Sequence, residues 1–501
     1  MSSPPLAVAR QSAVGEPDAL SDLLRGRQLY VASNRGPVQY RLTGDKVEPR
    51  PSPGGLATAL SALAAHAPLT WIAAALGPGD RLVAGRLERS HGLRGGPRLR
   101  FVSVPEESYD WFYNRFANPI LWLVQHGLWE LISRPDLKGL VESGWLRGYR
   151  PVNEAFAQAV AHEAAGSNSP VILTHDYHLY LLPRLLRKRI PGALLQHFTH
   201  IPWPDPETWE PLLPMVRREL CAGLLGADIV GFQTPGSVDA FLSSCAAFVP
   251  GARVDPARGM VWLDGHATEV RSYPISVDPS GLRRLARAAE TVRHKERLLP
   301  LLGRRTIVRV DRLDPSKNVA LGFRAFGRML ERRPDMVGRV RFLAFLVPSR
   351  QGIAEYRRYA REVWREVGAV NQRFGRDGWK PVVVFHEDNR AQAMAGMALA
   401  DVLLVNPVAD GMNLVAKEGP IVSDRDAVLV LSRECGAYHQ LGAAALSIPP
   451  LDLEATAAAL ERAVEMPPAE RKRRIRALRD AIETEDLSWW MHRQLQDLLA
   501  R

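Results

Sequence analysis

Short apolar runs alternate with longer stretches of helical periodicity along the whole chain. Runs such as LYVAS (29–33) and VRFLAFLV (340–347) contain few polar residues. Strands that are apolar on both faces are typical of parallel sheets covered by helices on each side. The stretches between them, such as NVALGFRAFGRMLERR (318–333), repeat apolar residues at a period near 3.6, which predicts crossover helices. We therefore expect an α/β fold with parallel sheets.

Twelve such runs are expected to be strands, which is enough for two sheets. They are residues 29–33, 69–76, 100–104, 170–175, 194–200, 228–234, 306–312, 340–347, 381–386, 401–407, 427–432 and 445–450. The series is interrupted near residues 275–290, so two doubly wound domains facing a cleft are expected. Ligands of such sheets bind beyond the carboxyl ends of the strands.

The break in the strand series also gives the expected domain organisation. We predict a loose N-terminal tail at 1–25, an N-terminal Rossmann-like domain at 26–280 and a C-terminal one at 281–480. A last helix at 481–501 is expected to pack back on the N-terminal domain.

Composition excludes several classes of protein. Of the 501 residues, 46% are apolar and 24% charged, as in ordinary globular proteins. The sequence has no run of eighteen apolar residues, which would predict a membrane span. The N-terminus does not resemble a secretory signal. The three cysteines, Cys221, Cys245 and Cys435, are far apart. Their spacing excludes a zinc ribbon or disulfide scaffold and favours the reducing cytoplasm.

The net charge of +11 allows two kinds of partner. A basic surface suits nucleic acid or small anionic substrates. The basic residues are nearly all arginine and are scattered over amphipathic stretches such as RKRRIRALRD (471–480). This distribution is typical of solvated helix faces, so we expect no nucleic-acid partner and no membrane partner.

Polar residues at the first strand ends are candidates for ligand binding. Arg35 follows the run at 29–33, and Gly54 and Gly55 precede a helical stretch. Paired glycines let a ligand approach backbone amides at a helix start, although most double glycines simply form turns.

Histidines gather at the ends of two further runs. His175, Asp176 and His178 follow one strand, while His197 and His200 end the next. Such a cluster could bind a metal ion or line a sugar or phosphate pocket. The pocket is favoured because no HExxH helix accompanies the cluster, and we expect no metal and no cofactor.

Cations follow the strands of the second half. Arg312, Lys317 and Arg350 lie just beyond strand ends, where arginine and lysine together suit a diphosphate. The alternative is a solvated loop in which Arg312 pairs with Asp314.

A glycine turn and a helix start follow the run at 401–407. The sequence DGMNLVAKE (410–418) combines them, so backbone amides and the helix dipole predict an anion site. Glu418, one turn into that helix, could bind the two hydroxyls of a ribose. Asp424-Arg425-Asp426 matches the D-x-D signature of metal-dependent sugar transfer, but three-residue matches are common and we interpret it as a decoy.

Several of these motifs together resemble the trehalose-6-phosphate synthases, which are retaining glycosyltransferases of the two-Rossmann-domain GT-B type. The resemblance runs from about residue 29 to 435. It rests on SNRGPV (33–38), SPGGL (52–56), YNRFANPILW (113–122), HDYHLYLLP (175–183), THIPWP (199–204), GADIVGFQT (226–234), YPISVDP (273–279), RLDPSK (312–317), VNQRFG (370–375) and DGMNLVAKE (410–418).

The resemblance implies roles for matching residues. Catalytic roles fall to His200 near the reacting carbon, Arg312 and Lys317 on the diphosphate, and Asp410 on donor hydroxyls. The acceptor phosphate would be bound by Arg35, Tyr113 and Arg350, and the acceptor sugar by Trp122 and Asp176. Donor binding would involve Gly54, Gly55, the amides of Asn413, Leu414 and Val415, and Glu418.

The implied reaction transfers glucose from UDP- or GDP-glucose to glucose 6-phosphate, with retention and without a side-chain base. Pro315, Asn318 and Ala409 depart from the usual family motifs and are closer to a branch that includes validoxylamine phosphate synthase, which uses a guanine nucleotide. The identity of the base in the donor nucleotide therefore stays open. Whether the chain forms a homo-oligomer is also open. Alternatives are a pseudo-sugar phosphate or glycerol 3-phosphate acceptor, a catalytically silent sugar-phosphate sensor, or a metal-dependent hydrolase.

Overall fold

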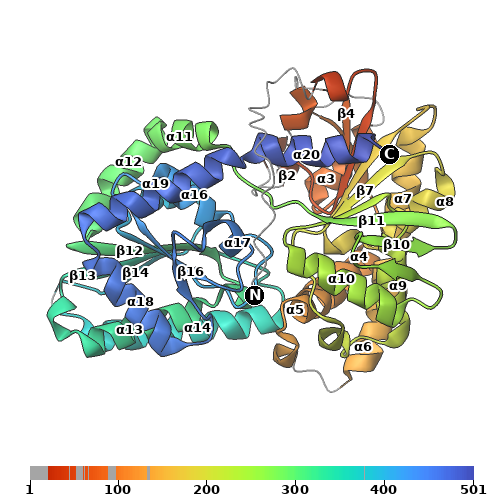
Figure 1. Ribbon diagram of the computed structural model, residues 1–501. Coiled ribbons are helices and arrows are strands. Elements are labelled where there is room, and N and C mark those ends of the chain that lie inside the picture. The colour runs from red at the N-terminus through yellow and green to blue at the C-terminus, as the bar shows by residue number, and fades with distance from the viewer. Residues whose placement is uncertain are drawn as a thin grey trace, which may run out of the picture.

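Two sheets, one in each half of the chain, organise the protein (Figure 1). The computed structural model describes residues 21–44, 46–51, 60, 62–65, 67–87, 97–132, 136–376 and 378–501. Within these ranges, no helix combines the length and the apolar character that a bilayer crossing requires.

The first sheet has nine strands, with β7 at its middle. Their order is β5 (Arg98–Val102), β4 (Leu69–Ala74), β1 (Leu29–Ser33), β6 (Val171–His175), β7 (Leu194–Phe198), β8 (Ile229–Phe232), β11 (His266–Ser272), β10 (Met260–Leu263) and β9 (Arg253–Asp255). Neighbours from β5 to β11 pair in parallel, while β10 pairs antiparallel with both β11 and β9.

Helices cover both faces of this sheet. One face packs against α7 (Arg150–Ala164), α8 (Leu182–Arg189), α9 (Pro214–Leu224) and α10 (Pro235–Phe248). The other face packs against residues of α20 (Leu487–Leu499). The remaining helical segments are α3 (Pro78–Leu87), α4 (Glu106–Asp110), a π-helix (Trp111–Leu121), α5 (Trp122–Gln125), α6 (Leu137–Gly144) and a second π-helix (Trp145–Tyr149).

The second sheet has six parallel strands. Their order is β14 (Val382–Phe385), β13 (Val340–Val347), β12 (Arg305–Arg312), β15 (Val402–Val405), β16 (Val428–Ser432) and β17 (Leu446–Ile448). On one side lie α13 (Val319–Arg332), α14 (Ala354–Phe374) and α18 (Leu453–Glu465) (Figure 1). On the other lie α11 (Pro279–Arg287), α12 (Ala289–Leu298), α15 (Arg390–Ala398), α16 (Val415–Val422) and α19 (Pro468–Thr484), with the short α17 (Tyr438–Leu441) beside α19.

Each of the twelve runs predicted as strands overlaps one, and all twelve pair in parallel. The expectation of parallel sheets alone was wrong at one edge, because β9 and β10 extend the first sheet in antiparallel fashion. The half-buried β11, which pairs in parallel with β8, was not predicted, nor was a separate antiparallel hairpin of β2 (Val38–Thr43) and β3 (Lys46–Pro51). These strands are short, half-buried or mostly exposed, so their sequences lack the continuous apolar run of a buried strand.

The chain passes between the two sheets twice, at neighbouring places. The first passage follows β11 at residues 273–278, and the second joins α19 to α20. The amide of Leu487 in the second passage donates to the carbonyl oxygen of Val277 in the first, at 2.9 Å. Trp490 of α20 donates its indole N–H to the carbonyl of Tyr273 at 3.0 Å. Ile275 and Val277 belong to an apolar cluster that reaches into both domains.

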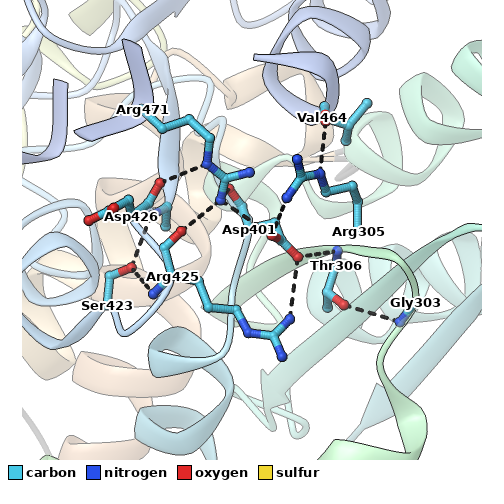
Figure 2. Close-up of polar contacts among 10 residues, drawn as sticks. Gly303, Arg305, Thr306, Asp401, Ser423, Arg425, Asp426, Val464 and Arg471 are labelled. Atoms are coloured by element: carbon cyan, nitrogen blue, oxygen red, sulfur yellow. Dashed lines mark hydrogen bonds and ion pairs between the residues drawn. The ribbon is translucent and has the colours of Figure 1, made fainter. Parts of the chain in front are cut away.

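A buried carboxylate fastens α19 to the amino ends of the second sheet (Figure 2). Asp401 is 3% exposed and accepts from Arg471 at 3.3 Å, from Arg305 at 3.1 Å and from the amide of Thr306 at 2.9 Å. Arg471 also donates to the backbone carbonyls of Arg425 at 2.8 Å and Asp426 at 3.2 Å. The D-x-D stretch therefore lies at the strands' amino ends, opposite to the edge where ligands of such sheets bind.

Candidate active site

The carboxyl ends of the two sheets face one another across the domain boundary. Arg35, Asp176 and His200 follow β1, β6 and β7 of the first sheet, whereas Arg350 and Asp410 follow β13 and β15 of the second. The two sides touch directly, because Arg350 Nη2 donates to the hydroxyl of Tyr177 at 3.0 Å. The structure thus brings predicted residues from both domains into one cleft.

Unusual backbone conformations concentrate at this cleft. Among the described residues, six that are not glycine have positive φ, and four of them follow strands at the cleft: Asp176 (73°), Asn318 (54°), Arg350 (45°) and Asn413 (67°). Such conformations are costly and persist where the surrounding structure enforces them, most often at functional sites.

Tyr113 lies at the centre of a cluster of positively charged side chains. Arg35 donates to its hydroxyl at 3.2 Å, and its ring stacks on His178 with centroids 5.8 Å apart. Burial raises the pKa of the Tyr113 phenol, but Arg35 and Arg350 more than offset this effect, so the pKa is lowered. Three arginines act on this phenol, because Arg312 also lowers its pKa. This cluster has the charge needed to bind a phosphate group.

Tyr113 belongs to a π-helix. The residues Trp111–Leu121 form wide helical turns that contain Pro119 and lead directly into α5 at Trp122. π-helical turns are rare and are frequently found at functional sites. The sequence analysis used this segment only as a family motif and did not predict its helix.

Arg350 is buried at the junction between the domains. Its guanidinium lies 4.2 Å from the ring centroid of Trp122, and Nη1 donates to Asp314 at 3.1 Å. Arg312 lies 5.3 Å above the same Trp122 ring, with its Nη2 3.7 Å from Asp314. Burial raises the pKa of the Asp314 carboxyl, but Arg350 and Arg312 outweigh burial and keep the pKa low. The Arg312–Asp314 pair of the alternative interpretation is therefore present, but Asp314 is buried, so the pair does not lie in a solvated loop.

Asp176 and His200 are joined through the backbone. The carboxylate of Asp176 accepts from the amide of His200 at 3.3 Å, and burial raises the Asp176 pKa to about 6. The His200 ring contacts His175 and Gln233, each at 3.3 Å. Burial, followed by the nearby His175 and His197, lowers the His200 pKa well below its ordinary value. The imidazole of His200 is therefore neutral at physiological pH.

Lys317 pairs with an acidic residue of the glycine-turn loop. Its Nζ donates to Asp410, which also accepts from the side-chain Nδ2 of Asn413 at 3.1 Å. Burial lowers the pKa of Lys317, but Asp410 raises it more, so Lys317 stays charged. The loop that carries Asp410 crosses to the first domain at Gly411, where a Cβ atom would lie 1.9 Å from the carbonyl oxygen of His200. Only glycine permits this approach.

The predicted helix start is α16, which begins at Val415 after the αL residue Asn413 and the N-cap Leu414. Glu418 lies in its first turn, and burial raises the pKa of this carboxyl. The neighbouring Lys417 is fully buried and donates to the carbonyl of Ile275 at 2.8 Å. The helix that carries Glu418 is thus tied to the passage between the domains.

The predicted histidine cluster is split among several environments. His175 and His200 contact each other, whereas His197 bonds to Thr174 at 2.8 Å and His178 packs against aromatic rings. In the described part of the chain, no three His, Cys, Asp or Glu side chains come together as a metal site would require. Gly54 and Gly55 lie outside the described residues.

Three cleft residues were not singled out in the sequence. Tyr177 reaches Arg350, Gln233 reaches His200, and His126 stacks on Trp122 at 4.2 Å. Tyr177 and Gln233 lie inside motifs that were recognised, so their motif membership was the available signal. His126 has none in the sequence.

The family model for glycosyltransferase family 20 matches residues 27–500. The chain belongs to glycosyltransferase family 20. It is therefore a glycosyltransferase, which confirms the prediction of an enzyme and the resemblance to trehalose-6-phosphate synthases. The trehalose-6-phosphate synthase of Mycolicibacterium smegmatis is 34% identical over 486 residues, which cover 94% of this chain and 92% of that protein.

One relative is longer than this chain, and its name gives two activities. The bifunctional trehalose-6-phosphate synthase/phosphatase of Thermoproteus tenax is 34% identical over 476 residues, which cover 92% of this family 20 chain. The matched part is 62% of the T. tenax protein, so this chain spans less than two thirds of that relative.

Solved family 20 structures have the same fold. An α,α-trehalose-phosphate synthase (UDP-forming) from Burkholderia xenovorans, in complex with glucose-6-phosphate, has a TM-score of 0.80 at 30% identity, covering 94% of this chain and all of the other. An E. coli structure bound with UDP-2-fluoro glucose has a TM-score of 0.79 at 29% identity, covering 95% and 99% of the two chains. The predicted GT-B architecture is confirmed.

Proposed function

We propose that this chain transfers glucose from a nucleotide diphosphate glucose to glucose 6-phosphate, giving α,α-trehalose 6-phosphate with retention at the donor carbon. The observation that carries the proposal is the charged cluster around Tyr113, where Arg35 of one domain and Arg350 of the other act on the same phenol. Such a cluster suits a phosphate on the acceptor. Glucose-6-phosphate in the B. xenovorans structure supports this choice of acceptor.

The donor would bind on the side of the second domain. We assign the diphosphate to Arg312 and Lys317, the donor hydroxyls to Asp410, and the ribose to Glu418. Cations fixed before the substrate arrives stabilise a leaving diphosphate without having to reorganise. The departing phosphate oxygen would take the proton from the acceptor hydroxyl, so no side-chain base is required.

We propose that the reaction needs no metal ion, because these cations already offset the diphosphate charge. Activity is expected to persist in EDTA. Restoration of a chelator-inactivated enzyme by magnesium would contradict this and return attention to Asp424 and Asp426.

The base of the donor is tested with a substrate panel. Purified protein is incubated with glucose 6-phosphate and UDP-, GDP- or ADP-glucose, and products are identified by mass. UDP-glucose is supported by the UDP-2-fluoro glucose complex of the E. coli relative, while the changes at Pro315, Asn318 and Ala409 favour testing GDP-glucose equally. A disaccharide phosphate with any donor supports the proposal, and its absence with all three overturns it.

The acceptor is tested by removing each phosphate-binding arginine. Arg35→Ala and Arg350→Ala are each expected to raise the KM for glucose 6-phosphate about ten- to a hundredfold, the value of one charge-assisted hydrogen bond. Nucleotide affinity should change little. The wild type should prefer glucose 6-phosphate over glucose, and each variant should lose most of that preference. Retention of the preference in both variants would place the phosphate elsewhere.

A further inference from the structure

A row of hydrogen-bonding groups runs behind the His200 ring, and its direction is determined at the end where Ile275 lies. At one end, the amide N–H of Ile275, which can only donate, bonds to Gln233 Oε1 at 2.9 Å. The Gln233 amide group must therefore donate from Nε2 to His200 Nδ1, 3.3 Å away. A nitrogen that accepts carries no proton, so the proton of neutral His200 is on Nε2.

The same direction continues into His175. His200 Nε2 lies 3.3 Å from His175 Nδ1. Since Nε2 carries the proton, His175 accepts at Nδ1 and must carry its own proton on Nε2. Burial lowers the pKa of His175 to about 3, which keeps this ring neutral as well.

The other end of the row is consistent with this direction. The carbonyl of Trp490, which can only accept, receives a hydrogen bond from Gln494 Nε2 at 3.2 Å. Gln494 therefore accepts through Oε1 from Gln196 Nε2, 2.9 Å away. This leaves Gln196 Oε1 as an acceptor, and it has no partner among the described residues.

A small cavity joins the two halves of the row. His175 and Gln196 both line it, together with Phe198 and Trp490, and it holds about 10 Å³ for the centre of a water molecule. That is room for one water. Both His175 Nε2 and Gln196 Oε1 are buried and lack a partner within the described residues. One water would accept from the first and donate to the second.

We propose that His175, Gln233 and Gln196 are positioning residues that hold His200 as the neutral Nε2–H tautomer in one orientation at the donor sugar. The row runs from Ile275, between the domains, to α20. It rests on the proposed function only for the identity of the sugar that His200 meets. The titratable groups that face His200 from its surroundings are His175, His197 and Asp176, and the second domain approaches it through Gly411.

The tautomer is tested by nitrogen NMR of ¹⁵N-histidine-labelled full-length protein. The His200 signals are identified by their loss in His200→Phe. In the wild type they should report Nε2–H and should not titrate between about pH 5.5 and 8, where an ordinary histidine titrates. An Nδ1–H tautomer, or a normal titration, would overturn the proposal. The measurement needs no substrate, so it stands apart from any failure of the proposed function.

A reversal of direction gives the second test. Gln233→Glu can still accept from Ile275, but its second carboxylate oxygen can only accept a hydrogen bond, so it favours a proton on His200 Nδ1. His200 should then become charged and titrate in this pH range. Gln496→Glu, the same change at an exposed position of α20, should leave the His200 signals unchanged. If Gln233→Glu also left them unchanged, the row would not determine the tautomer.

The role of His175 is tested by restoring its acceptor. His175→Leu removes the acceptor and should lower kcat about tenfold, the value of one hydrogen bond, with nucleotide KM nearly unchanged. His175→Asn places an amide oxygen near the position of Nδ1 and should recover most of this loss. Equal kcat values for the two variants, at equal thermal stability, would assign His175 a packing role only.

Discussion

At the scale of single residues, the two cations of the proposed diphosphate site differ in their present partners. Lys317 is paired with Asp410, while the nearest carboxylate to Arg312 is Asp314 at 3.7 Å. Arg312 therefore offers the less compensated charge, and Lys317 must exchange one anionic partner for another when a diphosphate binds.

Removal of either cation should reduce turnover. We expect Arg312→Ala and Lys317→Ala each to lower kcat at least about a hundredfold, the scale of losing one preorganised group at a developing charge. Lys472→Ala, on the exposed side of α19, is the matched control and should keep wild-type kcat. Steady-state kinetics decide the matter, and a near-normal rate in either cleft variant would remove that residue from the diphosphate site.

Asp176 should make stability depend on pH in a defined direction. Burial raises its pKa from an ordinary value of 3.8 to about 6, so the folded state binds this proton more tightly than the unfolded state. The contribution of Asp176 to the free energy of unfolding is therefore largest below about pH 4, falls as the pH rises through about 4 to 6, and stays lower above that range.

The variant Asp176→Asn isolates this contribution, and asparagine tolerates the positive φ of the position. Relative to the variant, the wild type should lose up to about 3 kcal/mol between pH 4 and 7, at 1.36 kcal/mol per pKa unit. Urea unfolding at several pH values measures it. Asp205→Asn, at an exposed position, should show no such difference, and parallel curves for wild type and Asp176→Asn would refute the raised pKa.

At the scale of elements, the buried parallel strands were the ones that the sequence predicted. Runs such as 340–347 are apolar at every position except Arg341, because helices cover both faces of their sheet. The strands β9 and β10 were missed because one is exposed or half-buried throughout and the other has a single fully buried residue. The π-helix was missed because its width depends on packing between distant segments and leaves no fixed spacing in the sequence.

Site residues were predictable where they follow a strand, and unpredictable where a partner comes from elsewhere. The strand ends alone pointed to Arg312, Lys317 and Glu418. The pairing of Lys317 with Asp410, 93 positions later, required the order of β12 and β15 in the sheet. The contact of Arg350 with Tyr177 required the arrangement of the two domains, which periodicity does not encode.

The Asp401 network is expected to carry much of the stability of the second domain. In Asp401→Asn, the 4% exposed Arg471 keeps its charge without a carboxylate, a loss of about 3–5 kcal/mol for a broken buried pair. Chemical denaturation measures it. Asp424→Asn breaks an exposed pair with Lys295 and should cost less than about 1 kcal/mol. Equal small losses would show that backbone carbonyls alone satisfy Arg471.

At the scale of the whole molecule, the closest approach of the two domains depends on a missing side chain. The Cβ of Gly411→Ala would meet the His200 carbonyl oxygen at 1.9 Å, so the domains must separate locally. We expect kcat/KM to fall about a hundredfold, as for a displacement near 1 Å at a reacting centre, with little change in Tm.

The control for this change is Gly236→Ala, where a Cβ would meet nothing within 4 Å. It should retain wild-type kinetics. X-ray scattering with saturating ligands should give a larger radius of gyration for Gly411→Ala than for wild type. Full activity of Gly411→Ala would mean that this approach is not part of the reacting state.

The return of α20 to the first domain has a consequence for synthesis on the ribosome. This helix buries Trp490 against a sheet whose β11 ends at Ser272, roughly 200 residues earlier. At about 5–20 residues per second, the delay is on the order of 10–40 s. During that time Leu173 and Phe198, which line the same cavity as Trp490, lack their cover and present an apolar surface to chaperones. The domain that is synthesised first is thus completed last. It lacks α20 while the other domain is translated.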